Sequence, residues 1–204
     1  RKKLYDSIMH FCKITDNIYR LKIPFDNIYT SVFLLAFNDK FALVDCATTT
    51  KDVDDYVIPT LREMKLGLDD INYIILTHNH GDHAGGLKRI LELSPNIKIV
   101  KEERFIFGKF STFSLAGHTS DCIGIFDQSS NTLISGDALQ CAGVGKYPCS
   151  ILDKDAYLKT IEKLNLDERV ENILFSHAYE PFYKDEILGR ENVIQCLKIC
   201  KNYI

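Results

Sequence analysis

Residues 71–83 read INYIILTHNHGDH and carry the clearest structural signal in the chain. Its first six residues are almost all apolar, which is typical of a strand that is covered on both faces. Three histidines and one aspartate then fall within six residues, namely His78, His80, Asp82 and His83. At a buried strand end, so many titratable groups would lose their hydration without compensation unless they bound a metal. Neutral imidazole and carboxylate are ligands for zinc, iron and manganese, so the stretch indicates a metal site.

The spacing inside this cluster predicts two groups of ligands. His78 and His80 are two residues apart in extended chain, so both side chains point to the same side. Gly81 then allows the chain to turn into a helix, which is expected over about 82–93. Asp82 and His83 therefore point in a different direction, where they can reach a second ion.

Further residues of the same chemistry follow other predicted strands. His118, Asp137 and His177 each come just after a strand, whereas His10 stands apart. Residues past strand ends can converge on one rim, because the sheet fixes their backbones. A lone histidine in such a place is usually hydrogen-bonded or solvent-facing. Taken alone, His118 and His177 therefore indicate no ligand.

The rest of the chain reads as strands and helices without a linker. Apolar and polar residues alternate over 14–23, and more apolar segments at 30–37 and 41–46 complete an antiparallel meander. Segment 51–65 predicts a helix that Pro59 should kink. We therefore expect residues 1–204 to form a single domain of two packed sheets with helices outside. The later strands and helices are expected over 97–100, 105–107, 112–115, 122–126, 132–135, 153–164 (helix), 170–175 and 185–201 (helix).

The composition limits the classes of partner. The chain has 204 residues and a net charge of −3, which argues against broad electrostatic binding to nucleic acid or an anionic membrane. No apolar run approaches the ~18 residues of a membrane span. The odd number of cysteines, seven, indicates thiols in a reducing compartment, so we expect a cytoplasmic protein. Cys196 and Cys200 are four residues apart and could share a metal, but packing on a buried helix face is the favoured interpretation.

The pattern His-x-His-x-Asp-His after an apolar strand ending in Thr resembles the metallo-β-lactamase superfamily. Three later landmarks match in order: Gly117-His118-Thr119, Ser135-Gly136-Asp137 and Ser176-His177. The resemblance covers the chain from about residue 14 onward. It implies an α+β fold, an αββα four-layer sandwich, with a two-metal site.

The resemblance also implies a role for each polar residue of these motifs. Asp45 would orient ligands from the end of an early strand, although Cys46-Ala47 replaces the usual small-residue and glycine pair after it. The metals would be two divalent ions, with zinc favoured and iron or manganese as alternatives. Asp82 and Asp137 are also the residues expected to act in catalysis. The first metal is expected on His78, His80 and His118, and the second on Asp82, His83 and His177, with Asp137 bridging.

The function implied by the resemblance is metal-dependent hydrolysis. A hydroxide shared by the two metals would attack the carbonyl of a small ester, thioester or lactone. The ligand set is similar to that of the hydroxyacylglutathione hydrolase branch, which adds a C-terminal glutathione-binding region. Because few residues follow His177 here, we do not expect glutathione specificity. Alternatives are a mono-iron dioxygenase resembling persulfide dioxygenases, a phosphodiesterase on the same fold and a non-catalytic metal-binding module.

The residues that would contact the substrate are less well defined. The partner is expected to be a small molecule, with no nucleic acid and no membrane, and the sequence specifies neither the substrate nor the oligomeric state. Lys146 and Tyr147 follow the predicted bridging aspartate, Tyr29 lies in the first hairpin and Tyr179 follows His177. For each of the four, packing or solvation is at least as common as a substrate contact.

Overall fold

The computed structural model describes residues 10–139, 150–179 and 183–204. The chain divides into two compact units, residues 1–101 and 102–204, and each is described by itself. No helix in the described residues is long and apolar enough to cross a membrane.

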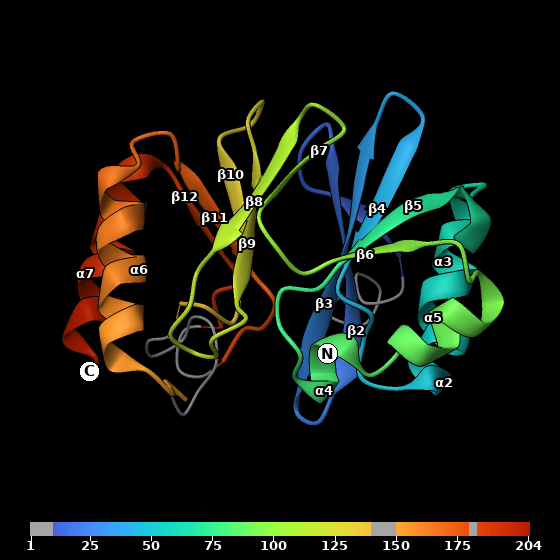
Figure 1. The fold of residues 1–204 in the computed structure, drawn as a ribbon, viewed down its shortest axis with the longest axis horizontal. Helices are drawn as coiled ribbons and strands as arrows, with labels where there is room; N and C mark the ends of the chain where they lie inside the picture. Colours follow the sequence, from blue (N-terminus) through green and yellow to red (C-terminus); the bar gives the residue numbers. More distant parts are fainter. Residues whose placement is uncertain (1–9, 140–149, 180–182) are drawn as a thin grey trace. The chain divides into compact units, whose positions relative to one another are not determined.

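Unit 1 contains one six-stranded sheet with the strands in sequence order (Figure 1). The predicted antiparallel meander forms as β2, β3 and β4, although the strand expected from residue 14 begins only at Ile18. The short strand β1, which was not predicted, pairs with β2, and β5 and β6 add in parallel at the other edge. The strands are β1 (Cys12–Lys13), β2 (Ile18–Phe25), β3 (Ile28–Phe37), β4 (Lys40–Val44), β5 (Ile71–Ile75) and β6 (Lys98–Val100).

Helices cover one face of this sheet because alternate strand residues are apolar. Leu21, Val32 and Leu43 from three neighbouring strands pack in one core with Val57 and Ile90 from the helices. The helical segments are α2 (Thr50–Asp52), the π-helix η1 (Val53–Val57), α3 (Ile58–Glu63), the 3-10 helix η2 (Leu68–Asp70), α4 (Gly81–Ala84) and α5 (Leu87–Leu93).

Two features of these helices refine the sequence prediction. The expected helix over 51–65 forms, but it widens into η1 just before Pro59, where the N–H of Ile58 donates to the carbonyl of Val53, five residues back. Proline has no N–H to continue the α-helical pattern, so the irregularity falls next to it. The expected helix over 82–93 is divided into α4 and α5 at Gly85 and Gly86.

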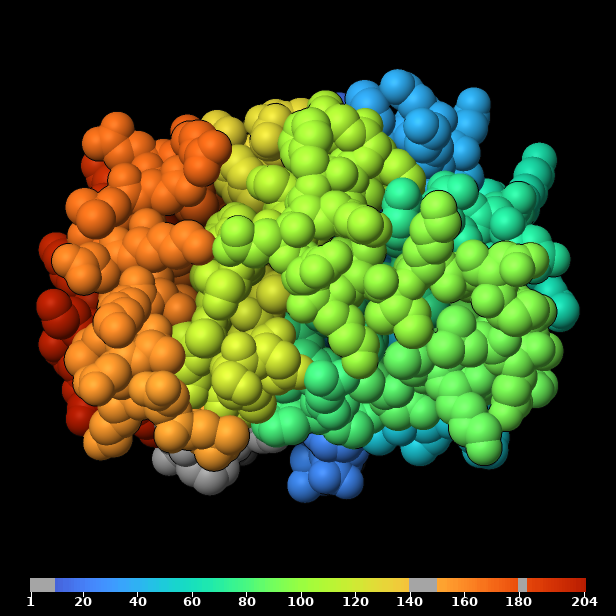
Figure 2. All heavy atoms as spheres, in the orientation of Figure 1, coloured from blue at the N-terminus to red at the C-terminus, as the bar shows by residue number. Residues whose placement is uncertain are grey.

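Unit 2 contains a second six-stranded sheet in the order β12-β11-β10-β9-β8-β7. Among the strand pairs of the described residues in this sheet, only β10–β11 is parallel. The two long helices lie side by side, and Figure 2 shows them at the surface of the unit in orange and red. The elements are β7 (Arg104–Ile106), β8 (Phe110–Ser114), β9 (Ile123–Asp127), β10 (Thr132–Gly136), α6 (Lys154–Leu166), β11 (Asn172–Phe175), β12 (Glu186–Leu188) and α7 (Arg190–Asn202).

The prediction of a helix over the whole of 185–201 was wrong at its start. Residues 186–188 form strand β12, in which Ile187 pairs with Ile173 and is buried. Gly189 then takes a φ of +87°, a conformation that favours glycine and separates the strand from α7. The apolar side chain of Ile187 suits either a helix or a strand, so periodicity did not distinguish them.

Both units follow the same plan around a parallel pair of strands. In unit 1 a helical crossover joins β4 to β5, and in unit 2 α6 joins β10 to β11. Because parallel neighbours end at the same edge of a sheet, the residues after them lie close together. Asp45 follows β4 and His78 follows β5, whereas Asp137 follows β10 and His177 follows β11.

Candidate metal centre

The predicted ligands of unit 1 form one donor set, which lies between β5 and the end of α4. His78 is buried and His80 is half-buried. Their ring centroids are 4.6 Å apart, and each ring offers a nitrogen within 4.8 Å of the other. The two imidazoles therefore lie together, as their spacing in extended chain predicts.

A buried carboxylate orients the next histidine. Asp45 accepts hydrogen bonds from the main-chain N–H and from the hydroxyl of Thr77, both at 2.8 Å, and from Nδ1 of His83 at 2.8 Å. Because a carboxylate only accepts, the proton of a neutral His83 ring lies on Nδ1 and the lone pair on Nε2. That Nε2 atom is 3.6 Å from Oδ2 of Asp82, so the two donor atoms lie next to each other.

The loop after β4 keeps the shape needed for this contact without the usual glycine. Asp45 and Ala47 both have φ of +65°, in the left-handed region. The N–H of Cys46 donates to the carbonyl of His83 at 2.6 Å, and the carbonyl of Ala47 accepts from Gly86 at 3.3 Å. The loop and the ligand-bearing turn are thus joined by their backbones.

Two glycines make this close approach possible. A Cβ atom on Gly85 would lie 1.8 Å from the carbonyl oxygen of Thr48, and one on Gly86 would lie 2.0 Å from that of Cys46. Both distances are far below any real contact with a backbone atom. The pair Gly85-Gly86 therefore ends α4 and lets the loop lie against it.

The predicted ligands of unit 2, His118, Asp137 and His177, form the other donor set, which centres on Asp137. This carboxylate is fully buried, and its two oxygens face one histidine each. Nε2 of His118 lies 3.9 Å from Oδ2, and Nε2 of His177 lies 3.4 Å from Oδ1. The Nδ1 atom of His118 is hydrogen-bonded to the carbonyl of Ser150, which directs its Nε2 towards Asp137.

Cys122, four residues after His118 in the sequence, is poorly suited to bind a metal. Burial raises the pKa of the Cys122 thiol to about 11, against the smaller lowering effect of its hydrogen bond with Thr119. A thiol must lose its proton to ligate, so Cys122 is a weak donor at neutral pH. Cys196 and Cys200 are buried on α7 in the core of unit 2, as the packing interpretation expects.

The donors present fit divalent cations. Both sets consist of imidazole and carboxylate, which zinc and similar metals prefer. Apart from His80, the predicted ligands are at most 7% exposed. Imidazole and carboxylate groups lose their hydration on burial, and a bound cation would offset the free-energy cost of that loss. The role of each residue as a ligand stays a prediction.

The four residues predicted as candidate substrate contacts lie in different surroundings. The ring centroid of Tyr179 is 5.6 Å from that of His177, which places the phenol beside a predicted ligand. Tyr29 instead packs under the ammonium group of Lys22, 4.6 Å from its ring centroid. Lys146 and Tyr147 lie outside the described residues.

Sequence reasoning did not single out Thr77 or Ser150. Thr77 immediately precedes His78, and the hydrogen bonds from its main-chain N–H and its hydroxyl to Asp45 fix the start of the ligand stretch. A polar residue at the end of an apolar strand was the available signal. Ser150 acts through its carbonyl, which every residue has, so no sequence signal marks it.

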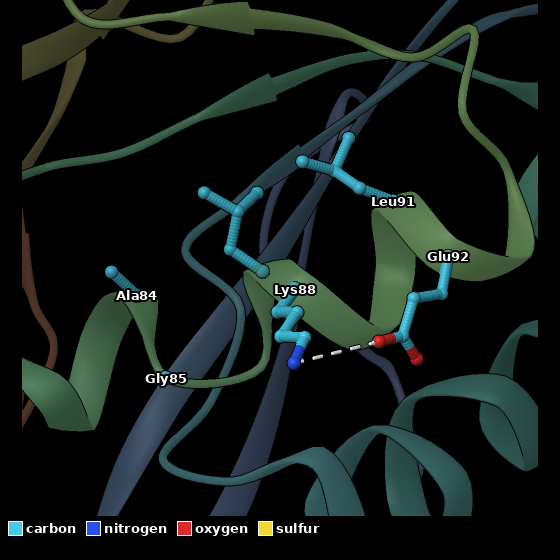
Figure 3. Close-up of a pocket in the computed structure, with 6 residues that line it drawn as sticks. Ala84, Gly85, Lys88, Leu91 and Glu92 are labelled. Carbon is cyan, nitrogen blue, oxygen red and sulfur yellow. Dashed lines mark ion pairs between the residues drawn. The ribbon is translucent and has the colours of Figure 1, made fainter.

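Unit 1 also has a shallow hollow on the outer surface of α4 and α5 (Figure 3). An ion pair between Lys88 and Glu92, 4.0 Å apart, lies at its rim. The hollow is lined by Ala84, Gly85, Leu87, Lys88, Leu91 and Glu92, and none of the predicted ligands is among them.

Comparison with known proteins identifies relatives of this chain. Residues 26–113 match the family model described as the metallo-beta-lactamase superfamily. A hydroxyacylglutathione hydrolase of Francisella tularensis is 30% identical over 108 residues, which cover 45% of this chain and 43% of the relative. Hydroxyacylglutathione hydrolase 1 of Vibrio vulnificus is 31% identical over 126 residues, 53% of this chain and 49% of the relative. The chain thus spans about half the length of the curated relatives it matches.

Solved structures show the same fold. The metallo-beta-lactamase from Erythrobacter litoralis superimposes with a TM-score of 0.69 at 16% identity, over 94% of this chain and 96% of that one. The DIM-1 metallo-beta-lactamase gives a TM-score of 0.72 at 13% identity, over 96% of this chain and 98% of that one. The chain is therefore an α+β protein with the metallo-β-lactamase fold, as predicted. The predicted resemblance to the metallo-β-lactamase superfamily is confirmed by the model match over residues 26–113 and by the similarity to these relatives.

Proposed function

We propose that this chain is a metal-dependent hydrolase that acts on a small ester, thioester or lactone. The observation that carries the proposal is the buried Asp137 carboxylate, whose two oxygens each face the Nε2 atom of a histidine. The names of the relatives support hydrolysis, since several are hydroxyacylglutathione hydrolases. We also propose that the substrate is a small molecule and that the protein is cytoplasmic. Residues 1–204 would act as one domain.

The residues that would hold two divalent cations, zinc first, are those of the two donor sets. When bound, such cations supply a water activated near neutral pH and a Lewis acid for the carbonyl oxygen. Asp82 and Asp137 would act as ligands and in catalysis. The assignment remains the one that the resemblance implies, with His78, His80 and His118 for one cation, Asp82, His83 and His177 for the other, and Asp137 for both.

The surrounding side chains prepare these donors. Asp45 holds the proton of His83 on Nδ1, so that Nε2 is available as a donor. The carbonyl of Ser150 does the same for His118. Each imidazole is thereby kept in one tautomer and one orientation before any ligand binds. Tyr179, beside His177, is the candidate for a hydrogen bond to the substrate.

The test combines metal content with hydrolysis. Wild-type protein loaded with zinc or manganese is assayed against model thioesters, lactones and phosphodiesters, and its metal is counted by mass spectrometry. His118→Ala and Asp137→Ala should abolish hydrolysis and lower the metal content, while circular dichroism remains that of the wild type. His10→Ala is the matched control, because His10 is exposed and pairs with Glu63. Near wild-type turnover by either variant would contradict the assignment.

A phosphodiesterase is the second candidate, and one observation favours it. Ribonuclease J of Mycobacterium tuberculosis is 34% identical over 65 residues, although these cover 30% of this chain and 12% of that protein. Cleavage of bis-p-nitrophenyl phosphate with no turnover of thioesters or lactones would select this candidate. One iron per chain with thiol-dependent oxygen uptake would instead select a mono-iron dioxygenase.

A further inference from the structure

The ligand-bearing helix α4 has a single turn, and its last carbonyls need partners outside the helix. Gly85 donates to the carbonyl of Gly81, but Gly86 donates to the loop residue Ala47 and so does not continue the pattern to Asp82. The carbonyl of Asp82 instead accepts the hydroxyl of Thr30 at 3.0 Å. A side chain of β3 is thus hydrogen-bonded to the main chain of Asp82, a predicted ligand.

Thr30 is a polar residue on a face of β3 that is otherwise apolar. It occupies the helix-facing row of the strand, in which the next two residues are Val32 and Leu34, both in the apolar core. Thr30 is fully buried, and its strand is already held by backbone pairing with Ile23. Valine has almost the same shape, so packing alone does not require the hydroxyl. The hydrogen bond to Asp82 does require it.

We propose that Thr30 is a positioning residue, which fixes the main chain of Asp82 and thereby the direction of the Asp82 carboxylate and the His83 imidazole. A second hydrogen bond, from the main-chain N–H of Cys46 to the carbonyl of His83 at 2.6 Å, holds the next residue of the same turn. With the hydroxyl removed, the carbonyl of Asp82 loses this hydrogen-bond donor, and the turn is held less firmly. The inference rests on the proposed function insofar as Asp82 and His83 bind a cation.

The first arm of the test needs no metal. Hydrogen exchange of the metal-free protein is followed by mass spectrometry in a peptide that covers residues 78–86. In Thr30→Val the amides of His83, Ala84 and Gly85, which close the turn of α4, should exchange at least about tenfold faster than in the wild type. In Thr30→Ser, which keeps the hydroxyl, the exchange should return towards the wild-type rate.

The second arm measures zinc binding by titration calorimetry. Thr30→Val should bind one zinc equivalent at least about tenfold more weakly than the wild type, the size of effect expected for residues that support ligands, and Thr30→Ser should recover most of the loss. The matched control is Thr60→Val. Thr60 is also buried and donates to a main-chain carbonyl, that of Tyr56 at 2.7 Å, but it lies in α3 away from the ligands. The Thr60→Val substitution should lower the free energy of unfolding without changing the affinity for zinc.

The outcomes separate the two ideas. A wild-type protein that binds no zinc contradicts the proposed function, and the exchange arm then still decides whether Thr30 holds the turn. Unchanged exchange and unchanged zinc affinity in Thr30→Val would overturn the role of Thr30 while leaving the proposed function intact. An equal loss of zinc affinity in Thr60→Val would also overturn it, because the effect would then be one of general stability.

Discussion

Ala47 has a backbone conformation that costs far less free energy for glycine than for alanine. Its φ of +65° lies in the left-handed region, where a Cβ atom crowds the backbone. The contacts of its loop to His83 and Gly86 hold the residue there. The loop therefore keeps its shape although Ala47 stands where the family resemblance implies a glycine, and it does so against local strain.

Ala47→Gly should consequently stabilise the protein by about 1 kcal/mol, because the left-handed conformation costs glycine almost nothing. Urea unfolding measures the change. Ala36→Gly is the matched control, since Ala36 lies in the regular strand β3 and has no positive φ. That substitution should destabilise by roughly 0.5–1 kcal/mol. A destabilised Ala47→Gly variant would show that the side chain contributes more than the strain removes.

At the scale of elements, Arg190 connects the two long helices of unit 2. It stands at the start of α7 and donates to the carbonyls of Leu164 and Asn165 at the end of α6, at 3.2 and 2.6 Å, and to Val170 at 3.1 Å. The last carbonyls of a helix have no partner within it, and a cation there also offsets the helix dipole. One side chain thus ends α6 and anchors α7.

Arg190→Ala should lower the free energy of unfolding by about 1–3 kcal/mol, because three carbonyls lose a charged donor. Arg169→Ala is the control, since Arg169 is exposed and pairs with Asp167 at the surface. Surface ion pairs contribute less, about 1 kcal/mol or below. Chemical denaturation compares both, and an equal loss in the two variants would contradict the anchoring role.

Elements with a regular pattern were predictable from the sequence, and those decided by tertiary contacts were not. Alternation of apolar and polar residues placed β2, and the more apolar runs placed β3 and β4. The division of the 82–93 helix was not predictable, since the reason for Gly85 and Gly86 is the loop that lies against them. Within the site, His78 to His83 signalled a metal by themselves. His118 and His177 became candidates only through the order of family motifs, because each is a single histidine after a strand.

At the scale of the whole molecule, metal removal tests the donor sets together. A cation that binds only the folded state stabilises it by about 2.7 kcal/mol when present at a hundred times its dissociation constant. For a chain of this length that corresponds to roughly 5–10 °C in Tm. Wild-type protein with zinc should therefore melt about 5–10 °C higher than with EDTA, by differential scanning calorimetry.

Asp137→Ala provides the comparison for that measurement. Its Tm should respond much less to EDTA, because Asp137 faces both histidines of its set. A shift as large as that of the wild type would mean that the stabilising cation binds somewhere else in the protein.

The parallel pairing of β4 with β5 and of β10 with β11 bears on the order in which the protein matures. Each pair joins strands that a helical crossover separates, and such non-local pairings form slowly during folding. Asp45, His78, Asp137 and His177 stand just beyond those strands. On the ribosome the donors therefore emerge one by one, and we expect the nascent polypeptide to hold no cation until its late pairing steps are complete.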